Sequence, residues 1–114
     1  MRVRNLTKKT VLAEEATVAN TSATRRRGLL KRQDFPRGEG LWIVPCEAVH
    51  TFWMKFPIDL VYLNKRKQVV KVRHAVPPWR ISACLRAHSV LELPAGVARD
   101  TNTKPGDQLK FERD

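Results

Sequence analysis

After residue 40 the chain is a series of short strand-like runs broken by proline and glycine, a pattern that favours a β-fold. Gln68–Val76 alternates between two faces, as a β-strand requires. Ile58–Leu63 is apolar on both faces apart from Asp59, which predicts a strand covered on both sides. By similar reasoning we expect further strands at Leu41–Val44, Val49–Met54, Ser89–Leu93 and Leu109–Phe111.

The first forty residues are expected to add two strands and one helix, at Arg2–Leu6, Thr10–Val18 and Ala23–Arg32. A hydroxyl of Thr21 or Ser22 can accept an orphan backbone N–H, which predicts the helix start. Gly28 inside the helix costs about 1 kcal/mol relative to alanine, which indicates close packing. Most connections are too short for a crossover helix, so we expect antiparallel pairing. The expected fold is mainly β: a small antiparallel β-sandwich or partly closed barrel with one short helix.

Length and composition predict a single globular domain, residues 1–114. Hydrophobic residues make up 42% of the chain, which is enough for a core and excludes a disordered composition. No apolar run approaches the roughly 20 residues that cross a bilayer, so we expect no membrane span. The N-terminus has no apolar stretch that would form a signal peptide. We therefore expect a cytoplasmic protein with Cys46 and Cys84 as reduced thiols.

The chain has 22 Lys and Arg against 11 Asp and Glu, a net charge of +11. A field of this sign attracts acidic partners and nucleic acid. Two basic runs stand out, and we interpret both as solvated faces, with phosphate binding as the alternative: Arg25–Arg27 with Lys31 and Arg32, and Lys65–Lys67 with Lys71 and Arg73. No base-reading motif accompanies them, so nucleic-acid binding is expected to be non-specific and weak at physiological salt.

The segment Pro45–Asp59 concentrates reactive side chains. Cys46, His50 and Met54 would suit a soft metal such as Cu(I) or Zn(II). In a strand, however, Cys46 and His50 would lie ~13 Å apart, and in a helix Cys46 and Met54 would lie ~12 Å apart. We therefore expect no metal and no cofactor, and interpret Cys46 and Met54 as core residues. A turn at residues 47–48 that brings two of the three together keeps a metal site as an alternative.

A small enzyme is a further alternative, with Cys46 or Cys84 as nucleophile, His50 as base and Asp59 as the group that orients it. No strained elbow or flanking glycine marks either cysteine as a nucleophile. We therefore expect a protein without catalytic residues.

Asp59 lies on an apolar strand face, where a carboxylate must find a partner. We expect that partner to be His50, Arg25 or Arg80, or else the N–H groups of a loop.

Trp79 lies in a proline-bounded loop that cannot be a central strand. Beside Arg80 it suits a platform for a flat ligand, and the alternative is that it folds back over the end of the sandwich. A core position is one interpretation of Trp53. We therefore expect a non-catalytic binding module for an unknown small molecule or acidic partner, with its site where Pro45–Asp59 meets Pro77–Arg80. The expected contacts are His50, Thr51, Asp59, Trp79 and Arg80.

The sequence resembles a family of small prokaryotic proteins known as domain of unknown function 192. The resemblance is carried by several motifs along nearly the whole chain: Arg25-x-x-Gly28-Leu29-Leu30, Gly40-Leu41-Trp42-Ile43, Val49-His50-Thr51-Phe52-Trp53-Met54, Pro57-Ile58-Asp59, Val90-Leu91-Glu92-Leu93, Ala95-Gly96 and Gly106-Asp107. Together these motifs are specific, whereas each alone is weak. The resemblance implies a small β-rich, sandwich-like fold and no established activity.

Overall fold

The computed structural model describes residues 1–113, without the side chains of Arg26 and Arg27. This part of the chain forms ten strands and two short helices. In chain order they are β1 (Arg2–Asn5), β2 (Thr10–Ala13), β3 (Glu15–Ala19), α1 (Ser22–Arg27), β4 (Glu39–Ile43), β5 (Ala48–His50), β6 (Ile58–Leu63), β7 (Val69–Val76), β8 (Ile81–Ala83), β9 (Ser89–Pro94), α2 (Val97–Asp100) and β10 (Leu109–Glu112). The mainly-β class predicted from the sequence is therefore confirmed. Neither helix is long and apolar enough to cross a membrane.

The centre of the fold is a five-stranded sheet in the order β3-β4-β9-β6-β7. Its neighbouring strands pair antiparallel, except that β3 and β4 run parallel with Thr17 opposite Leu41. The expectation of antiparallel pairing was wrong at this one place. The connection between β3 and β4 contains α1 and is long enough to return the chain to the same end of the sheet.

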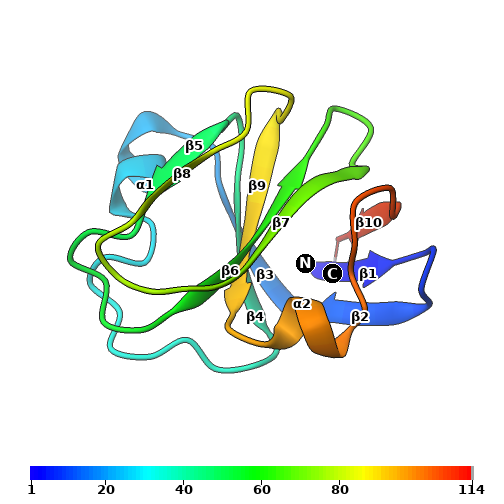
Figure 1. Ribbon diagram of the computed structural model, residues 1–114, viewed down its shortest axis with the longest axis horizontal. Helices are drawn as coiled ribbons and strands as arrows, with labels where there is room; N and C mark the ends of the chain where they lie inside the picture. Colours follow the sequence, from blue (N-terminus) through cyan, green and yellow to red (C-terminus); the bar gives the residue numbers. More distant parts are fainter. Residues whose placement is uncertain (114) are drawn as a thin grey trace.

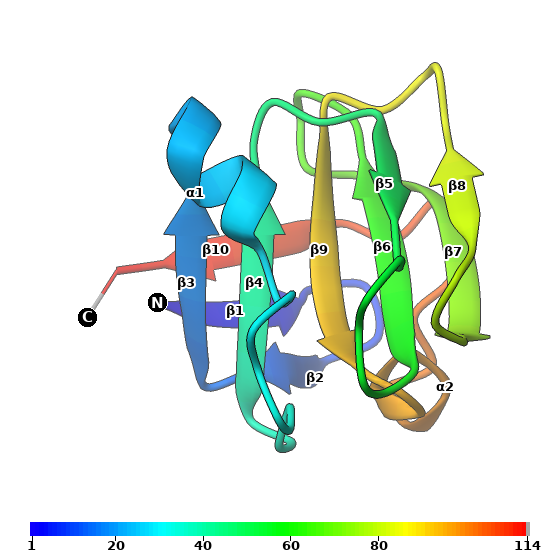
Figure 2. The same ribbon diagram turned by 90° about the vertical axis from the view of Figure 1, so that its left-hand side faces the viewer.

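Two layers cover the faces of this sheet, on opposite sides in Figures 1 and 2. A smaller sheet in the order β10-β1-β2 packs on one face, and its strands cross those of the larger sheet steeply (Figure 2). Helix α1 and a two-stranded ribbon of β5 and β8 lie over the other face. One buried cluster, which includes Val61 and Leu91, lies under the smaller sheet, and a second, which includes Leu60 and Tyr62, lies under α1 and the ribbon. The result is a sandwich that does not close into a barrel.

Helix α1 begins as the sequence predicted. Thr21 is its N-cap, and the Thr24 N–H donates to Thr21 Oγ1 at 3.1 Å. The helix is shorter than the expected Ala23–Arg32 because Gly28 takes a φ of 45° and ends it. Gly28 does not mark close packing, since an added Cβ would meet only the Arg25 carbonyl, at 3.8 Å. Its positive φ is the reason for glycine at this position.

Several element boundaries differ from the sequence-based expectation. The predicted strand Thr10–Val18 is interrupted at Glu14, which separates β2 from β3. The predicted strand Val49–Met54 ends at His50 as β5. Strand β8 and helix α2 were not predicted.

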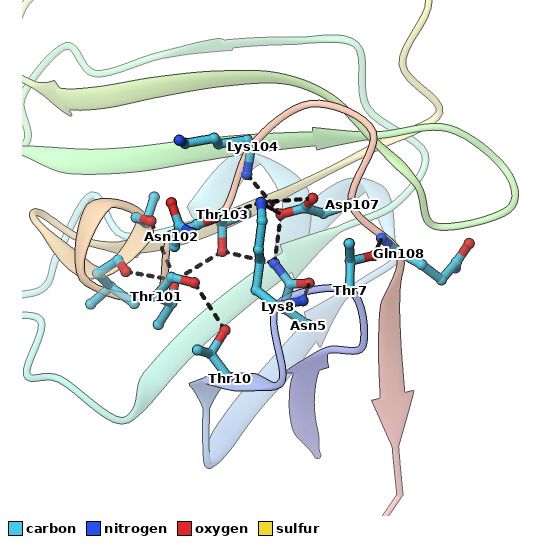
Figure 3. Close-up of polar contacts among 12 residues, drawn as sticks. Asn5, Thr7, Lys8, Thr10, Thr101, Asn102, Thr103, Lys104, Asp107 and Gln108 are labelled. Atoms are coloured by element: carbon cyan, nitrogen blue, oxygen red, sulfur yellow. Dashed lines mark hydrogen bonds and ion pairs between the residues drawn. The ribbon is translucent and has the colours of Figure 1, made fainter.

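A buried polar network fastens the smaller sheet to the chain before β10 (Figure 3). The Asp107 carboxylate accepts hydrogen bonds from Asn5 Nδ2 at 2.9 Å and from the Lys104 N–H at 2.9 Å. Lys8 Nζ donates to both of its oxygens at 3.0 Å. Burial alone would raise the pKa of Asp107, but these hydrogen bonds outweigh burial and lower it. Asp107 is therefore ionised at neutral pH and ties the β1–β2 turn to the loop after α2.

Candidate functional site: a groove and an aromatic cluster

A groove of about 680 Å³ opens between α1 and the segment that leads into β5. Strands β4 and β9 supply its floor, on the sheet face that carries the second buried cluster. Sites for small organic molecules commonly have volumes of roughly 300–1,000 Å³, so the groove has a suitable size. Its lining residues are Ser22, Arg25, Gly28, Leu29, Leu30, Ile43, Pro45, Cys46, Glu47, Ala48, Val49, His50, Met54 and Glu92.

Glu92 lies on the floor of this groove, in the middle of β9. Its cross-strand neighbours are Leu41 on β4 and Leu60 on β6, and both are buried. The residue is only 4% exposed, and its carboxyl group has no hydrogen-bond or ion-pair partner among the described residues. Burial raises the pKa of Glu92 to about 8, so the group carries a proton at neutral pH.

The structure brings Cys46, His50 and Met54 to the same groove. Met54 is buried in the second cluster, as the sequence predicted, and Cys46 is half-buried at its edge. The Cys46 thiol donates to the Ala48 carbonyl at 3.2 Å, and burial raises its pKa. A protonated thiol is a poor nucleophile and a poor metal ligand. Within residues 1–113, no three His, Cys, Asp or Glu side chains gather closely enough to hold a metal ion.

Four rings form an aromatic cluster beside the groove: His50, Phe52, Trp53 and Trp79. The ring centroids of His50 and Phe52 are 5.1 Å apart, Phe52 stacks on Trp79 at 5.8 Å, and Trp53 meets Trp79 edge-on at 4.6 Å. Trp53 is 68% exposed and Trp79 is 53% exposed. The core interpretation of Trp53 was therefore wrong, and Trp79 does not fold back over the end of the sandwich. Both tryptophans have a φ of 69°, which bulky residues rarely adopt and which is enriched at functional sites.

Thr51 joins the two segments that the sequence predicted to meet. Its hydroxyl donates to the Pro77 carbonyl at 2.7 Å and accepts the Arg80 N–H at 2.9 Å. Its own N–H donates to the Arg80 carbonyl at 2.8 Å, and its carbonyl accepts the Trp79 N–H at 3.1 Å. Thr51 is 1% exposed and holds the two segments together from below the surface, whereas the Arg80 side chain is exposed beside Trp79.

Asp59 is fully buried and lies away from the other predicted site residues, on the opposite face of the sheet. One carboxylate oxygen accepts the Ala75 N–H at 2.7 Å. The other accepts the N–H groups of Gly96 at 3.1 Å and Ala98 at 2.8 Å, at the start of α2. The partners are backbone N–H groups, but they belong to strand β7 and to the start of α2 and not to a loop, and the side chains of His50, Arg25 and Arg80 are not among them. The reason is that α2 and a bulge in β7 turn unpaired N–H groups toward this carboxylate.

The site prediction did not include Glu92, which the structure places on the floor of the groove. The signal was available, because Glu92 shares a strand face with Val90 and Pro94 in an apolar run. The argument that singled out Asp59 applies equally to it.

Two residues of the second basic run contact the β8 strand. Lys71 Nζ donates to the Ala83 carbonyl at 2.8 Å, and an Arg73 Nη1 contact reaches Ser82 Oγ at 3.4 Å, so both hold the β8 strand. The side chains of Arg26 and Arg27 lie outside the described residues.

Comparison with known protein families identifies the family of this chain. The model of domain of unknown function 192, described as "Uncharacterized ACR", matches residues 3–111. The chain belongs to this family. Among curated relatives, a UPF0127 protein of Pyrococcus furiosus is 30% identical, over 96% of this chain and 97% of its own length. A UPF0127 protein of Pyrococcus horikoshii is also 30% identical, over 85% of this chain and 87% of its own length.

Two solved structures share the fold of this member of the domain of unknown function 192 family. A protein of unknown function from Novosphingobium aromaticivorans has a TM-score of 0.83 at 21% identity, covering 96% of this chain and 82% of its own. A Sinorhizobium meliloti protein, described provisionally as a transcription regulator, has a TM-score of 0.82 at 19% identity, covering 96% and 89%. At these identities the likeness shows the fold alone. The resemblance seen in the sequence is confirmed, and the family is uncharacterised.

Proposed function

We propose that this protein is a non-catalytic binding module for a small molecule, and that the groove and the aromatic cluster together form its site. The observation that carries the proposal is their continuity through His50, which lines the groove and packs on Phe52. Exposed tryptophan faces suit stacking on a flat or cyclic ligand, while the groove suits a substituent of that ligand. Thr51 supports the proposal because its hydrogen bonds fix the cluster before any ligand arrives.

The arrangement of side chains supports binding rather than nucleophilic catalysis. In the alternative enzyme, Asp59 would have to orient His50, but its oxygens are occupied by three backbone N–H groups on the other face of the sheet. The thiol that would serve as nucleophile, Cys46, has a raised pKa. A cytoplasmic setting belongs to the proposal, because the free thiols Cys46 and Cys84 suit a reducing compartment.

The test is retention of small molecules from a metabolite extract by the purified protein, followed by gel filtration and mass spectrometry. Wild type is expected to retain at least one compound in near-stoichiometric amount. The double variant Trp53→Ala/Trp79→Ala should retain at least about tenfold less, because the stacking platform is gone. Leu85→Ala removes a similarly exposed apolar side chain outside the cluster, and serves as the matched control.

Two results would count against a binding module. If wild type enriches nothing beyond the double variant, the cluster is not a small-molecule site. If the enriched compound is converted to a product with turnover, the protein is an enzyme instead.

A further inference from the structure

Glu92 is an exception among the buried acids of this protein. Asp59 accepts three backbone N–H groups, and Asp107 is bonded to Asn5 and Lys8. Glu92 is similarly buried, yet no described residue bonds to its carboxyl group, although the chain contains 22 Lys and Arg. Buried polar groups are nearly always hydrogen-bonded, so the lack of a partner at Glu92 calls for an explanation.

The surroundings of Glu92 are open on one side only. Leu41 and Leu60 flank it within the sheet, and the space in front of it is the groove of about 680 Å³. The lining of that groove near Glu92 includes the apolar side chains of Leu29 and Ile43. A partner for the carboxyl group can therefore reach it from the groove, and the rest of such a ligand would lie against apolar surface.

The other charged or titratable groups that line the groove belong to α1 and to the segment around β5. They are Arg25, Cys46, Glu47 and His50. Arg25 Nη1 donates to the Asn20 carbonyl at 3.0 Å in an exposed position. Glu47 and His50 are exposed, and Cys46 donates to Ala48. None of these groups is bonded to Glu92.

We propose that the groove binds organic cations, specifically molecules with a protonated amine on an apolar stem, and that Glu92 receives the amine. The proposal rests on the proposed function, since it names the ligand class of the same groove. An ammonium group donates hydrogen bonds, which an ionised carboxylate accepts, and its positive charge compensates the negative charge of a carboxylate that is largely removed from water. An alcohol can bond to Glu92 without compensating a charge, and a carboxylic acid would bring a second negative group.

Binding would be linked to a proton. The free protein keeps Glu92 protonated at neutral pH, because burial raises its pKa to about 8. An ammonium ligand favours the ionised form, so Glu92 would release its proton to solvent as the amine binds. The net charge of +11 opposes binding of any cation, so a preference for amines must come from the groove itself.

The experiment compares three probes of equal chain length: hexylamine, 1-hexanol and hexanoate. Each is titrated into isotope-labelled protein at pH 7, and dissociation constants are taken from amide shifts of the groove residues. Glu92→Gln is the test variant, and Glu15→Gln, an exposed position on β3, is the matched control. Calorimetry in phosphate and in Tris then measures the protons released with hexylamine.

We expect hexylamine to bind wild type at least about tenfold more tightly than 1-hexanol, with hexanoate weakest. Glu92→Gln should bring hexylamine to the level of 1-hexanol and abolish proton release, whereas Glu15→Gln should change neither. Equal binding of the amine and the alcohol to wild type would overturn the cation inference but leave a binding groove. Absence of binding by all three probes, or an amine preference that survives in Glu92→Gln, would also overturn it. Retention of a compound through the tryptophans alone would then still support the binding module.

Discussion

Glu92→Gln is expected to stabilise the protein, by an amount that grows as the pH rises from about 5 to 8. In the wild type the carboxyl group is buried between Leu41 and Leu60 without a partner, so its ionised form is strongly disfavoured in the folded state. Glutamine has nearly the same size and never ionises. Glutamine therefore removes the pH-dependent free-energy cost of burying an ionisable group, and it leaves the packing unchanged.

The sign follows from the raised pKa of Glu92, about 8 in the folded protein against an ordinary value of 4.5. Below pH 4.5 the group is protonated in both states and contributes nothing. Between 4.5 and 8 the unfolded chain releases the proton while the folded protein keeps it, so stability falls by up to about 1.4 kcal/mol per pH unit. Above pH 8 both states are ionised and the loss is constant, on the order of 5 kcal/mol.

Urea denaturation of wild type and Glu92→Gln at pH 5 and pH 8 measures this effect. The difference in free energy of unfolding should be small at pH 5 and on the order of several kcal/mol at pH 8. Glu15→Gln, measured in the same way, shows how loss of a solvent-exposed carboxylate changes the free energy of unfolding. A difference between Glu92→Gln and wild type that is the same at both pH values would mean that Glu92 is ionised in the folded protein or hydrated through the groove.

The sequence predicted the fold correctly where the apolar pattern of a segment is compatible with only one kind of burial. The bounds of β6 agree with the prediction for Ile58–Leu63, because six residues that are apolar on both faces need cover on both sides. It also predicted that the segments around Thr51 and Arg80 meet. It did not predict the exposure of Trp53, because the left-handed backbone that carries Trp53 out of a strand leaves no sign in residue types.

The site was harder to predict because it depends on packing between distant elements. The groove exists only because α1 lies beside the segment before β5. Nothing in the sequence of either segment indicates that the two are neighbours. The partners of Asp59 are backbone N–H groups, which every residue except proline carries, so an inventory of side chains misses them. Glu92 could have been found from its strand parity, but its lack of a partner is visible only in the structure.

Asp59→Ala is expected to destabilise the protein by about 3 kcal/mol or more. The carboxylate accepts three N–H groups, from Ala75 in the β7 bulge and from Gly96 and Ala98 at the start of α2. Alanine would leave all three buried or partly buried donors without an acceptor. Total stabilities of small proteins are roughly 5–15 kcal/mol, so this is a large share. The urea midpoint at pH 7 measures the loss, with Asp34→Ala, an exposed loop acid, as the control.

Asp59→Asn separates a structural role from a direct role in ligand binding. Its one amide oxygen can still accept some of the N–H groups, while its NH₂ group would face a donor, so an intermediate loss of stability is expected. Because Asp59 lies on the sheet face opposite the groove, Asp59→Asn should bind hexylamine as wild type does under conditions where it is folded. An unchanged urea midpoint for Asp59→Ala would contradict the structural role. A stable Asp59→Asn with weakened amine binding would show instead that Asp59 influences the groove from the opposite face of the sheet, through β6 and the neighbouring β9.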